Sequence, residues 1–348
     1  LRCEYGVWGD GEDVLPELIY RLNNNSSIED VPGLVLRGII KSPNRIKELR
    51  KTDVRALSWI DIKRYIRKGA NYPVQTKRGC TKKCLYCTYY TIEGVKGRFK
   101  EAKDVAEEVL LAKKYYRPKV IEFVDSTFNL PKEHAIDVCE ALIERKIGLE
   151  FEASGINPAD VSEELFLSMK RANFNSAIIT PDSASEPVLK GLNKGFSVKD
   201  VVKTAEYTKK AGIPVLWSFL MGGPNEDENT IRETFRFIRE ETSSRDVAFV
   251  GLGVRIYPNT QMARRAVKEG IIKEDEDLLE PKFYFSPDRE TLIRLIKEEA
   301  KGIKNIITVA DNQHPIVEIL TPLVRLLGLP GPLWRYSRWL RTLHGILS

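Results

Sequence analysis

Three cysteines, Cys80, Cys84 and Cys87, lie within eight residues of one another in the stretch QTKRGCTKKCLYCTYY. The chain has only five cysteines, and the other two, Cys3 and Cys139, stand alone. An odd number of cysteines with three of them clustered is not typical of a disulfide framework. The spacing C-x3-C-x2-C therefore predicts a metal centre bound by thiolates.

The number of thiols favours one kind of metal centre. A zinc site favours four ligands, often as two separated pairs. Here no second cysteine pair follows, and the three histidines (His134, His314 and His344) are distant in sequence. A redox C-x2-C motif needs only two cysteines. Three thiolates suit a 4Fe–4S cluster with one iron left open, which is a position for a substrate or cofactor.

Basic residues accompany the cysteines. Lys77 and Arg78 precede the first cysteine, and Lys82 and Lys83 precede the second. Because a thiolate-bound cluster is an anion, nearby cations stabilise its negative charge. We expect these four residues to favour the reduced form of the cluster.

The elements that position these residues alternate regularly between strand and helix. Several of the strands are nearly continuous apolar runs, as in parallel strands buried on both faces. Such alternation with short links predicts right-handed βαβ units. The expected strands are 72–78, 120–126, 149–154, 176–182, 214–222 and 247–257, and the expected helices are 102–116, 132–146, 162–173, 198–212 and 228–242.

Six such units, rather than eight, predict an α/β fold with an open, partial (β/α)6 barrel over residues 71–262. Functional residues then belong at the C-terminal ends of the strands. Residues 1–70 contain a strand–turn–helix pattern followed by a short strand or hairpin. Residues 263–348 are expected to form a small, mostly helical substrate or accessory region. Its last segment, 334–348, carries arginines beside apolar residues, which fits either a membrane surface or a helix packed on the barrel.

Composition is typical of a soluble globular protein. The chain has 348 residues, of which 42% are hydrophobic and 30% charged, and its net charge is +6. No apolar run is long enough to span a bilayer. No long Lys/Arg tract marks a nucleic-acid surface. We expect a cytoplasmic protein without a transmembrane segment or a nucleic-acid partner, and peripheral membrane contact is compatible with the sequence.

The cysteine spacing, its place after the first strand and the barrel pattern together resemble the radical S-adenosylmethionine (SAM) superfamily, from about residue 72 to about 260. This resemblance implies that Cys80, Cys84 and Cys87 hold a 4Fe–4S cluster and that SAM binds its open iron. Reduction then cleaves SAM to methionine and a 5′-deoxyadenosyl radical, which takes hydrogen from an unactivated carbon. Thr81 departs from the family, where proline is usual. The alternative is a structural zinc or three buried thiols.

The resemblance also implies that polar groups at successive strand ends bind SAM. Tyr86 is expected near the adenine, and Asp125 at the methionyl amine. The turn LMGGPNEDE resembles the family's GxPxE turn, whose glycines let the backbone approach the adenine. Taken alone, each carboxylate is more typical of a helix cap or a surface group, and their recurrence at successive strand ends is what favours a binding role. The complete expected set is Tyr86, Asp125, Ser126, Ser154, Asp182, Lys194, Gly222, Gly223 and Arg255.

Further motifs resemble the cobalamin-dependent branch of the superfamily. They are D-S-x-F-N-x-P, the run DSASEPVLKGLNKG and the element YPNT. The N-terminal GVWGDGEDVLPELIYRL resembles the end of a Rossmann-like cobalamin-binding domain, with Asp10 replacing the first glutamate of a GEGE turn. We therefore expect residues 1–30 to be the tail of such a domain whose front part is missing. The alternative is a short α/β appendage unconnected with cobalamin.

These resemblances predict a cobalamin-dependent C-methyltransferase. One alternative is radical carbon–carbon coupling or cyclisation without methyl transfer, including on a lipid. Another is an iron–sulfur binding or electron-transfer protein that does not use SAM. The expected partners are a small-molecule or lipid substrate and an electron donor such as flavodoxin or ferredoxin.

Overall fold

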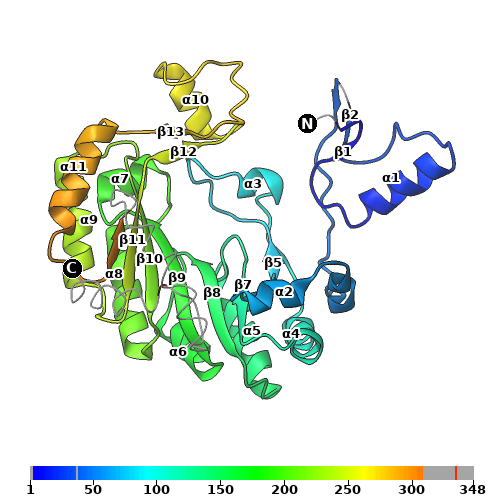
Figure 1. The fold of residues 1–348 in the computed structure, drawn as a ribbon, viewed down its shortest axis with the longest axis horizontal. Helices are drawn as coiled ribbons and strands as arrows, with labels where there is room; N and C mark the ends of the chain where they lie inside the picture. The colour runs from blue at the N-terminus through cyan, green and yellow to red at the C-terminus, as the bar shows by residue number, and fades with distance from the viewer. Residues whose placement is uncertain (1–2, 37, 309–333, 335–348) are drawn as a thin grey trace.

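The computed structural model describes residues 3–36, 38–308 and 334, and its centre is a seven-stranded parallel sheet (Figure 1). The strand order is β14-β11-β10-β9-β8-β7-β4, so that sequence neighbours lie side by side along most of the sheet. The bounds are β4 Tyr72–Val74, β7 Val120–Phe123, β8 Glu150–Ile156, β9 Phe174–Asp182, β10 Val215–Met221, β11 Val247–Leu252 and β14 Ile306–Thr308. The predicted α/β class with a parallel sheet is confirmed.

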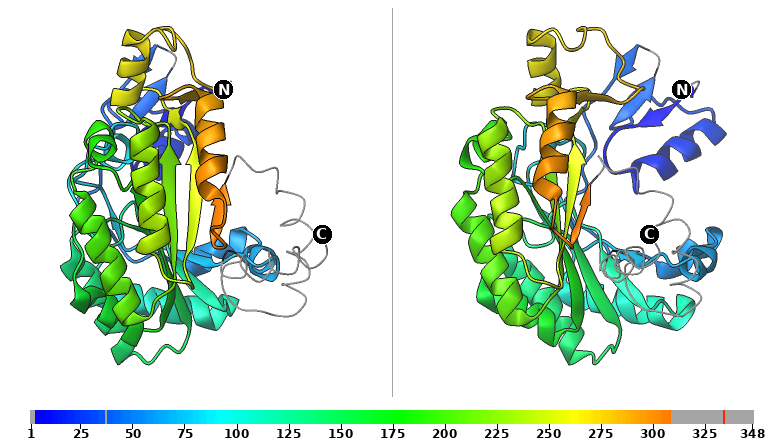
Figure 2. Two further views of the ribbon diagram at one scale, coloured as in Figure 1. Left: turned by 90° about the vertical axis from the view of Figure 1, so that its left-hand side faces the viewer. Right: turned by 60° about the vertical axis from the view of Figure 1, so that its left-hand side comes forward.

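Helices connect successive strands and cover the outer face of the sheet (Figure 2). Local sequence sets their ends: Ser197 and Asp200 form a capping box at the start of α8, and Gly212 takes a left-handed conformation at its end. Asp227 and Thr230 cap α9 in the same way. The bounds are α4 Ala102–Tyr116, α5 Lys132–Glu144, α6 Glu163–Arg171, α7 Glu186–Gly191, α8 Val198–Ala211, α9 Glu228–Glu240, α10 Gln261–Lys268 and α11 Arg289–Ala300.

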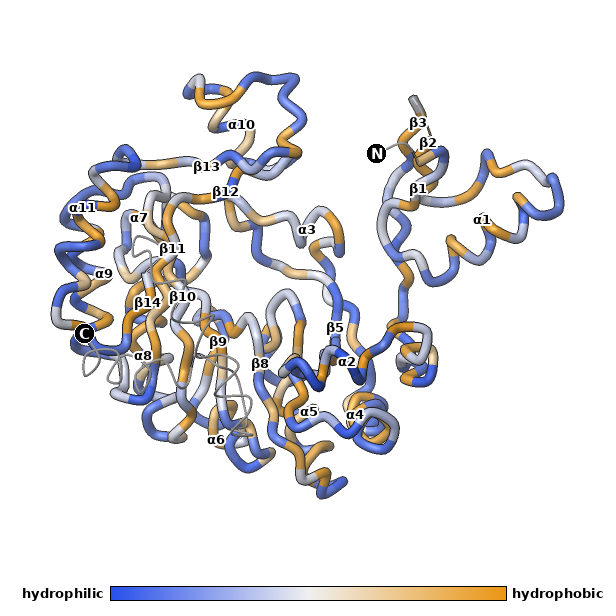
Figure 3. The backbone as a smooth tube through the Cα atoms, viewed as in Figure 1, coloured by the Kyte–Doolittle hydropathy of each residue, from blue (hydrophilic) through white to orange (hydrophobic). Residues whose placement is uncertain are grey.

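The main hydrophobic core lies between the sheet and these helices. Apolar residues are concentrated along the strands (Figure 3). Phe123, Phe151 and Phe174, from three adjacent strands, pack ring against ring with centroids 5.4–5.9 Å apart. Trp217 on β10 is fully buried and meets Phe237 of α9 edge to face. This packing fixes the strands whose ends carry the site.

The first predicted strand, 72–78, is shorter in the structure. It ends at Val74, and the chain then forms β5, Lys77–Arg78, which pairs antiparallel with β6, Arg98–Phe99. The reason is a side chain from the next strand: Asp125 accepts the backbone N–H groups of Thr76 and Lys77 at 2.8 and 3.0 Å. The chain therefore leaves the sheet just before the cysteines.

The last predicted strand, 247–257, is divided in two. Gly253 has φ +78° and separates β11 from β12, Val254–Ile256, which pairs antiparallel with β13, Lys282–Tyr284. Beyond it, β14 adds a strand to the sheet from the region expected to be mostly helical. The arginine-bearing segment 334–348 lies outside the described residues except for residue 334.

The N-terminal region forms a small separate unit beside the sheet (Figure 1). It contains β1 Gly6–Val7, α1 Val14–Asn23, β2 Leu34–Leu36 and β3 Ile39–Ile40, in agreement with the predicted strand–turn–helix and hairpin. Two short helices, η1 Val54–Trp59 and α2 Ile62–Arg67, lead to the sheet. Within the described ranges, no helix is both long and apolar enough to cross a bilayer.

Candidate metal and cofactor site

The cysteine loop, residues 79–97, connects β5 to β6 and contains the short helix α3, Tyr89–Ile92. Cys80 and Cys84 are buried, Cys87 is partly buried, and all three thiols are free. At the base of the loop, the Cys80 amide donates to the Gly94 carbonyl at 3.0 Å. These contacts hold three unpaired thiols at the end of the first strand.

Backbone hydrogen bonds also fix the middle of the loop to distant parts of the chain. The Leu85 amide donates to the Leu192 carbonyl at 2.9 Å, and the Met262 amide donates to the Leu85 carbonyl at 2.8 Å. Gly79 is required at the start of the loop. It has φ +92°, and a Cβ there would lie 2.3 Å from the Lys96 carbonyl oxygen. The cysteines are thus presented by a loop that is fixed at both ends and in the middle.

Two of the three thiols, Cys84 and Cys87, are in surroundings that favour the protonated form. Burial raises the pKa of Cys84 to about 11, and burial also raises the pKa of Cys87. A metal ligand must be a thiolate, so binding would have to displace these protons. These buried thiols are suited to binding a thiophilic metal cluster, and not to thiol redox chemistry, which requires exposed thiolates.

The donor set fits a four-iron cluster. In such a cluster each thiolate binds a separate iron, so three cysteines leave one iron without a protein ligand. Cys80, Cys84 and Cys87 provide three free thiols on one loop.

Tyr86, Asp182 and Lys194, which we call the Tyr86 cluster, meet beside the cysteines. The Tyr86 hydroxyl and the Lys194 ammonium both donate to Asp182 Oδ2, the second at 2.6 Å. Lys194 Nζ also donates to the Thr180 carbonyl at 3.2 Å and lies 5.7 Å from the centroid of the Tyr86 ring. The three residues were each predicted as cofactor-binding groups, and the structure brings them together.

Charge pairing stabilises the Tyr86 cluster. Burial alone would lower the pKa of Lys194, but the adjacent Asp182 carboxylate outweighs it and raises that pKa. Burial, together with the same carboxylate, raises the pKa of Tyr86. Lys194 is therefore a cation and Tyr86 a neutral hydrogen-bond donor. Only about 3% of each of Asp182 and Lys194 is exposed, so the pair holds the aromatic ring in place beside the thiols.

Asp125, expected at the amino group of a bound SAM, is engaged within the protein. Oδ1 accepts the amides of Thr76 and Lys77, and Oδ2 accepts the Thr76 hydroxyl at 2.7 Å. Because the Thr76 hydroxyl donates to Asp125, the ring nitrogen Nε2 of His134, 3.0 Å from Thr76 Oγ1, is assigned as the donor of that contact. Burial raises the pKa of Asp125 to about 6.

Two serines from the predicted set have different surroundings. The Ser126 hydroxyl is buried and has no hydrogen-bond partner among the described residues. Ser154 donates to Glu122 Oε1 at 2.6 Å and is therefore directed along the sheet. Its neighbour Gly155 has φ +73°, and a Cβ there would lie 3.2 Å from the Asp125 carbonyl oxygen. Of these two serines, Ser126 is therefore the one whose hydroxyl has no hydrogen-bond partner in the described structure.

The turn after β10 is held by a glutamate that sequence reasoning did not single out. Glu226 Oε2 accepts the amides of Gly222 and Gly223, the second at 3.1 Å. Glu226 Oε1 has no partner in the described structure, and burial raises the pKa of Glu226 to about 8. The GxPxE resemblance contained this residue, so the signal was present. Arg255 lies on β12, outside the parallel sheet, with its guanidinium 4.7 Å from the centre of the Tyr257 ring.

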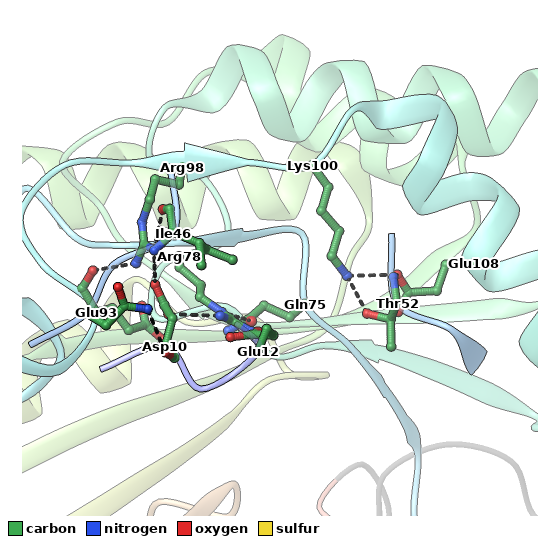
Figure 4. Close-up of polar contacts among 11 residues, drawn as sticks. Asp10, Glu12, Ile46, Thr52, Gln75, Arg78, Glu93, Arg98, Lys100 and Glu108 are labelled. Atoms are coloured by element: carbon green, nitrogen blue, oxygen red, sulfur yellow. Dashed lines mark hydrogen bonds and ion pairs between the residues drawn. The ribbon is translucent and has the colours of Figure 1, made fainter. Parts of the chain in front are cut away.

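A second group of charged residues, the Asp10 cluster, lies where the N-terminal unit meets the cysteine loop (Figure 4). Asp10 accepts hydrogen bonds from Arg78 at 2.8 Å, from Arg98 and, at 2.9 Å, from the Ile46 amide. Arg78 also pairs with Glu12 at 2.5 Å. Burial alone would raise the pKa of Asp10, but these donors outweigh it and lower that pKa. Arg78 and Arg98 are at the two ends of the loop, so one carboxylate joins both ends to the N-terminal unit.

Next to the Asp10 cluster is a cavity of about 990 Å³. One wall comes from the turn that contains Asp10 and from apolar residues of α1, including Leu15 and Ile19, which are half exposed. The other wall includes Arg78 and Glu93 from the ends of the cysteine loop. Its mixed lining and size are typical of a small-molecule or cofactor site.

The family model of the radical SAM superfamily matches residues 74–238. An uncharacterized methyltransferase of Pyrococcus horikoshii is 24% identical over 274 residues, covering 76% of this chain and 58% of that protein. An anaerobic magnesium-protoporphyrin IX monomethyl ester cyclase of Synechocystis is 25% identical over 209 residues, covering 56% of this chain and 40% of that protein. This chain thus spans about half the length of these relatives.

Among solved structures, the radical S-adenosylmethionine methyltransferase TsrM from Kitasatospora setae, with cobalamin and a [4Fe-4S] cluster bound, shares the fold. The TM-score is 0.79 at 19% sequence identity, and the match covers 97% of this chain and 77% of TsrM. The likeness therefore extends beyond the family match, over the N-terminal unit as well.

Proposed function

Since this chain carries a radical SAM domain over residues 74–238, we propose that it is an enzyme that functionalises an unactivated carbon, by cobalamin-dependent methylation. The observation that carries the proposal is the cysteine loop itself. It holds three free thiols at the C-terminal edge of a parallel sheet, next to a built cluster of polar groups. Three thiolates leave one iron of a four-iron cluster without a protein ligand.

In this proposal, Cys80, Cys84 and Cys87 hold the 4Fe–4S cluster. When bound, the cluster supplies the electron that cleaves SAM to methionine and a 5′-deoxyadenosyl radical. The electron would come from a small donor protein such as a flavodoxin or ferredoxin. Burial of Cys80 and Cys84 excludes water from two of the three ligand positions. The loop's fixed ends keep the thiols in place without the metal, which is the preorganisation that such a site needs.

The remaining residues of the predicted set bind and orient SAM. The Tyr86 ring, held by Asp182 and Lys194, forms one side of the adenosine site. Gly222 and Gly223, whose turn Glu226 closes, let the backbone approach the adenine on another side. The unused Ser126 hydroxyl is the free polar group near Asp125 for the methionyl end. Ser154 and Arg255 complete the set at the third and last strands.

Cobalamin is proposed as the methyl carrier, with the N-terminal unit as part of its binding surface. The cavity next to the Asp10 cluster is lined by α1 and by residues from both ends of the cysteine loop, and these residues would hold part of the corrin. TsrM, whose fold is similar over nearly the whole chain, was solved with cobalamin bound. The substrate class is a small molecule or a lipid.

The first test is the anaerobic incubation of the reconstituted chain with SAM and dithionite. We expect formation of 5′-deoxyadenosine that depends on the cluster, and a reduction to background in Cys84→Ala, because that variant lacks one iron ligand. The matched control is Cys139→Ala, which removes a buried thiol from α5, away from the loop. Equal yields from the wild type and Cys84→Ala would contradict the radical reaction. They would favour an iron–sulfur protein that does not use SAM.

A second candidate function is carbon–carbon coupling or ring closure without methyl transfer, which the similarity to a cyclase favours. The two candidates differ in their need for cobalamin. Equilibrium dialysis with hydroxocobalamin tests this need. Methyl transfer requires a 1:1 complex of the chain with cobalamin. The Ile19→Arg variant, which places a larger side chain in the cavity, should weaken that complex. A 1:1 complex that Ile19→Arg weakens would favour methyl transfer over the second candidate.

A further inference from the structure

Of the four basic residues beside the cysteines, only Lys77 is completely buried. Arg78 is paired with Asp10 and Glu12, Lys82 donates to the Gly195 carbonyl at the surface, and Lys83 is exposed. A lysine without exposure is rare unless it is paired, because a buried charge loses its hydration. The surroundings of Lys77 therefore need an explanation.

The Lys77 ammonium donates to two neutral acceptors. It lies 3.0 Å from Thr127 Oγ1 and 3.4 Å from the Gly79 carbonyl oxygen, and neither contact is to a carboxylate. Burial lowers the pKa of Lys77, and the negative charge of Asp125 acts against that shift. The Asp125 oxygens themselves are taken by Thr76 and by the Lys77 amide. The positive charge of Lys77 is thus held in the protein without a direct ion pair in the described structure.

Thr127 extends this contact to a cysteine. Its hydroxyl lies 3.9 Å from Cys80 Sγ, within the range of a hydrogen bond to sulfur. An ammonium group can only donate, so Thr127 Oγ1 is the acceptor from Lys77 and its own hydrogen is left to point at the sulfur. The contacts therefore have one direction, from Lys77 Nζ through Thr127 Oγ1 to Cys80 Sγ.

The other two cysteines have different donors. Cys87 Sγ accepts the Tyr89 amide at 3.4 Å, a backbone contact that side-chain substitution cannot remove. Cys84 has Lys194 in its neighbourhood, but that ammonium is paired with Asp182. Cys80 thus differs from the other two cysteines. Its hydrogen-bond donor, Thr127, itself accepts a hydrogen bond from Lys77, a buried cation without a direct ion pair in the described structure.

We propose that Lys77 and Thr127 form a positioning relay that directs positive charge at the sulfur of Cys80 and makes the cluster easier to reduce. The inference rests on the proposed function, because it requires that Cys80 is a cluster ligand. Hydrogen bonds to ligand sulfurs and nearby positive charge stabilise the more negative, reduced state, and both raise the reduction potential. A buried cation is screened much less than an exposed one, so Lys77 contributes more than Lys82 or Lys83.

The test compares isosteric variants of both relay residues in the full-length chain, reconstituted with iron and sulfide under anaerobic conditions. Lys77→Met removes the charge, and Thr127→Val removes the hydroxyl while it keeps the shape. The matched controls are Lys83→Met, which removes an exposed charge from the same loop, and Thr127→Ser, which restores the hydroxyl. For each protein, iron content and the midpoint potential from an EPR-monitored redox titration are measured.

We expect Lys77→Met and Thr127→Val to shift the midpoint potential to more negative values at normal iron content. Thr127→Ser and Lys83→Met should stay at the wild-type value. The double variant should shift by less than the sum of the two single shifts, because both residues act along one chain of hydrogen bonds. A structural role alone would change iron content or stability and leave the potential of the loaded protein unchanged.

Three outcomes would overturn the inference. The first is an unchanged potential in iron-replete Thr127→Val, which decides the matter even where Lys77→Met does not fold. The second is a shift in Lys83→Met as large as that in Lys77→Met, since this would show a diffuse effect of charge. The third is a wild-type chain that binds no cluster, and this result alone would also overturn the proposed function.

Discussion

Asp10 and Asp125 are two buried carboxylates at the base of the cysteine loop, and they differ in the charge of their donors. Asp10 receives hydrogen bonds from two guanidinium groups and one amide, and its pKa is lowered. Asp125 receives only neutral donors, two amides and a hydroxyl, and its pKa is raised to about 6. At Asp10 the charged donors outweigh the effect of burial on the pKa, whereas at Asp125 the neutral donors do not.

The comparison shows two ways to fix a loop. The ion pairs of Asp10 join parts of the chain that are far apart in sequence, and they require the charge of every member. The hydrogen bonds of Asp125 shape the turn after β4 and do not require its charge. Replacing each aspartate by asparagine keeps the shape and removes the charge, so this pair of substitutions tests the difference directly.

The largest expected effect is that of Asp10→Asn. It leaves the buried Arg98 without its carboxylate and leaves Arg78 with Glu12 alone. Breaking a buried pair in this way costs about 4 kcal/mol. We expect the free energy of unfolding in urea to fall by about this amount. Asp30→Asn is the control, because its pair with Arg21 is at the surface, and it should have no measurable effect. Equal losses of unfolding free energy in Asp10→Asn and Asp30→Asn would show that the Asp10 ion pairs contribute no more to stability than a surface pair.

The Asp125→Asn variant should differ from the wild type mainly in its pH dependence. In the wild type, the folded-state pKa is raised from 3.8 to about 6, so stability is fully present below about pH 3.8 and falls as the pH rises through about 6. Asparagine cannot ionise. Relative to the wild type, the variant should therefore gain about 3 kcal/mol between pH 3.5 and pH 7. Urea unfolding at these two pH values measures this change, and a constant difference would show that Asp125 titrates normally.

Substitution of His134 should change the free energy of unfolding least, and its pH dependence should run in the opposite direction to that of Asp125. Burial lowers its pKa from 6.5 to about 4, so the stability that it contributes is present above pH 6.5 and is lost as the pH falls through about 4. Glutamine at this position can still donate to Thr76 and cannot become charged. His134→Gln should therefore gain about 1 kcal/mol relative to the wild type between pH 7 and pH 5, after allowance for its partial exposure. A gain on raising the pH instead would contradict the burial of a neutral ring.

Parts of the fold were predictable because their signals are local. The helix expected at 102–116 is α4, with the same bounds, since an amphipathic pattern of that length fixes a helix by itself. The end of the first strand was not predictable in this way. It is set by Asp125, which lies 49 and 48 positions from the two amides that it accepts. Strand ends that depend on such distant partners leave no mark in the local pattern.

The site shows the same division. Tyr86, Asp182 and Lys194 could each be named from motifs, but that they share hydrogen bonds depends on the order of strands in the sheet. Lys77 could be named as a nearby cation, and only its burial distinguishes it from Lys83. Glu226 was within a recognised motif, yet its contact with two glycine amides needs the conformation of the turn.

The contacts of Asp10 also affect the order in which the chain can become stable during synthesis. Asp10 is made early, but its partners Arg78 and Arg98 follow 68 and 88 positions later. Arg78 can pair with Asp10 first, but until Arg98 has been made the carboxylate cannot join both ends of the cysteine loop. Forming these contacts closes a long segment of chain, which costs conformational entropy. On the ribosome, the complete Asp10 cluster can therefore form only after residue 98 has been translated.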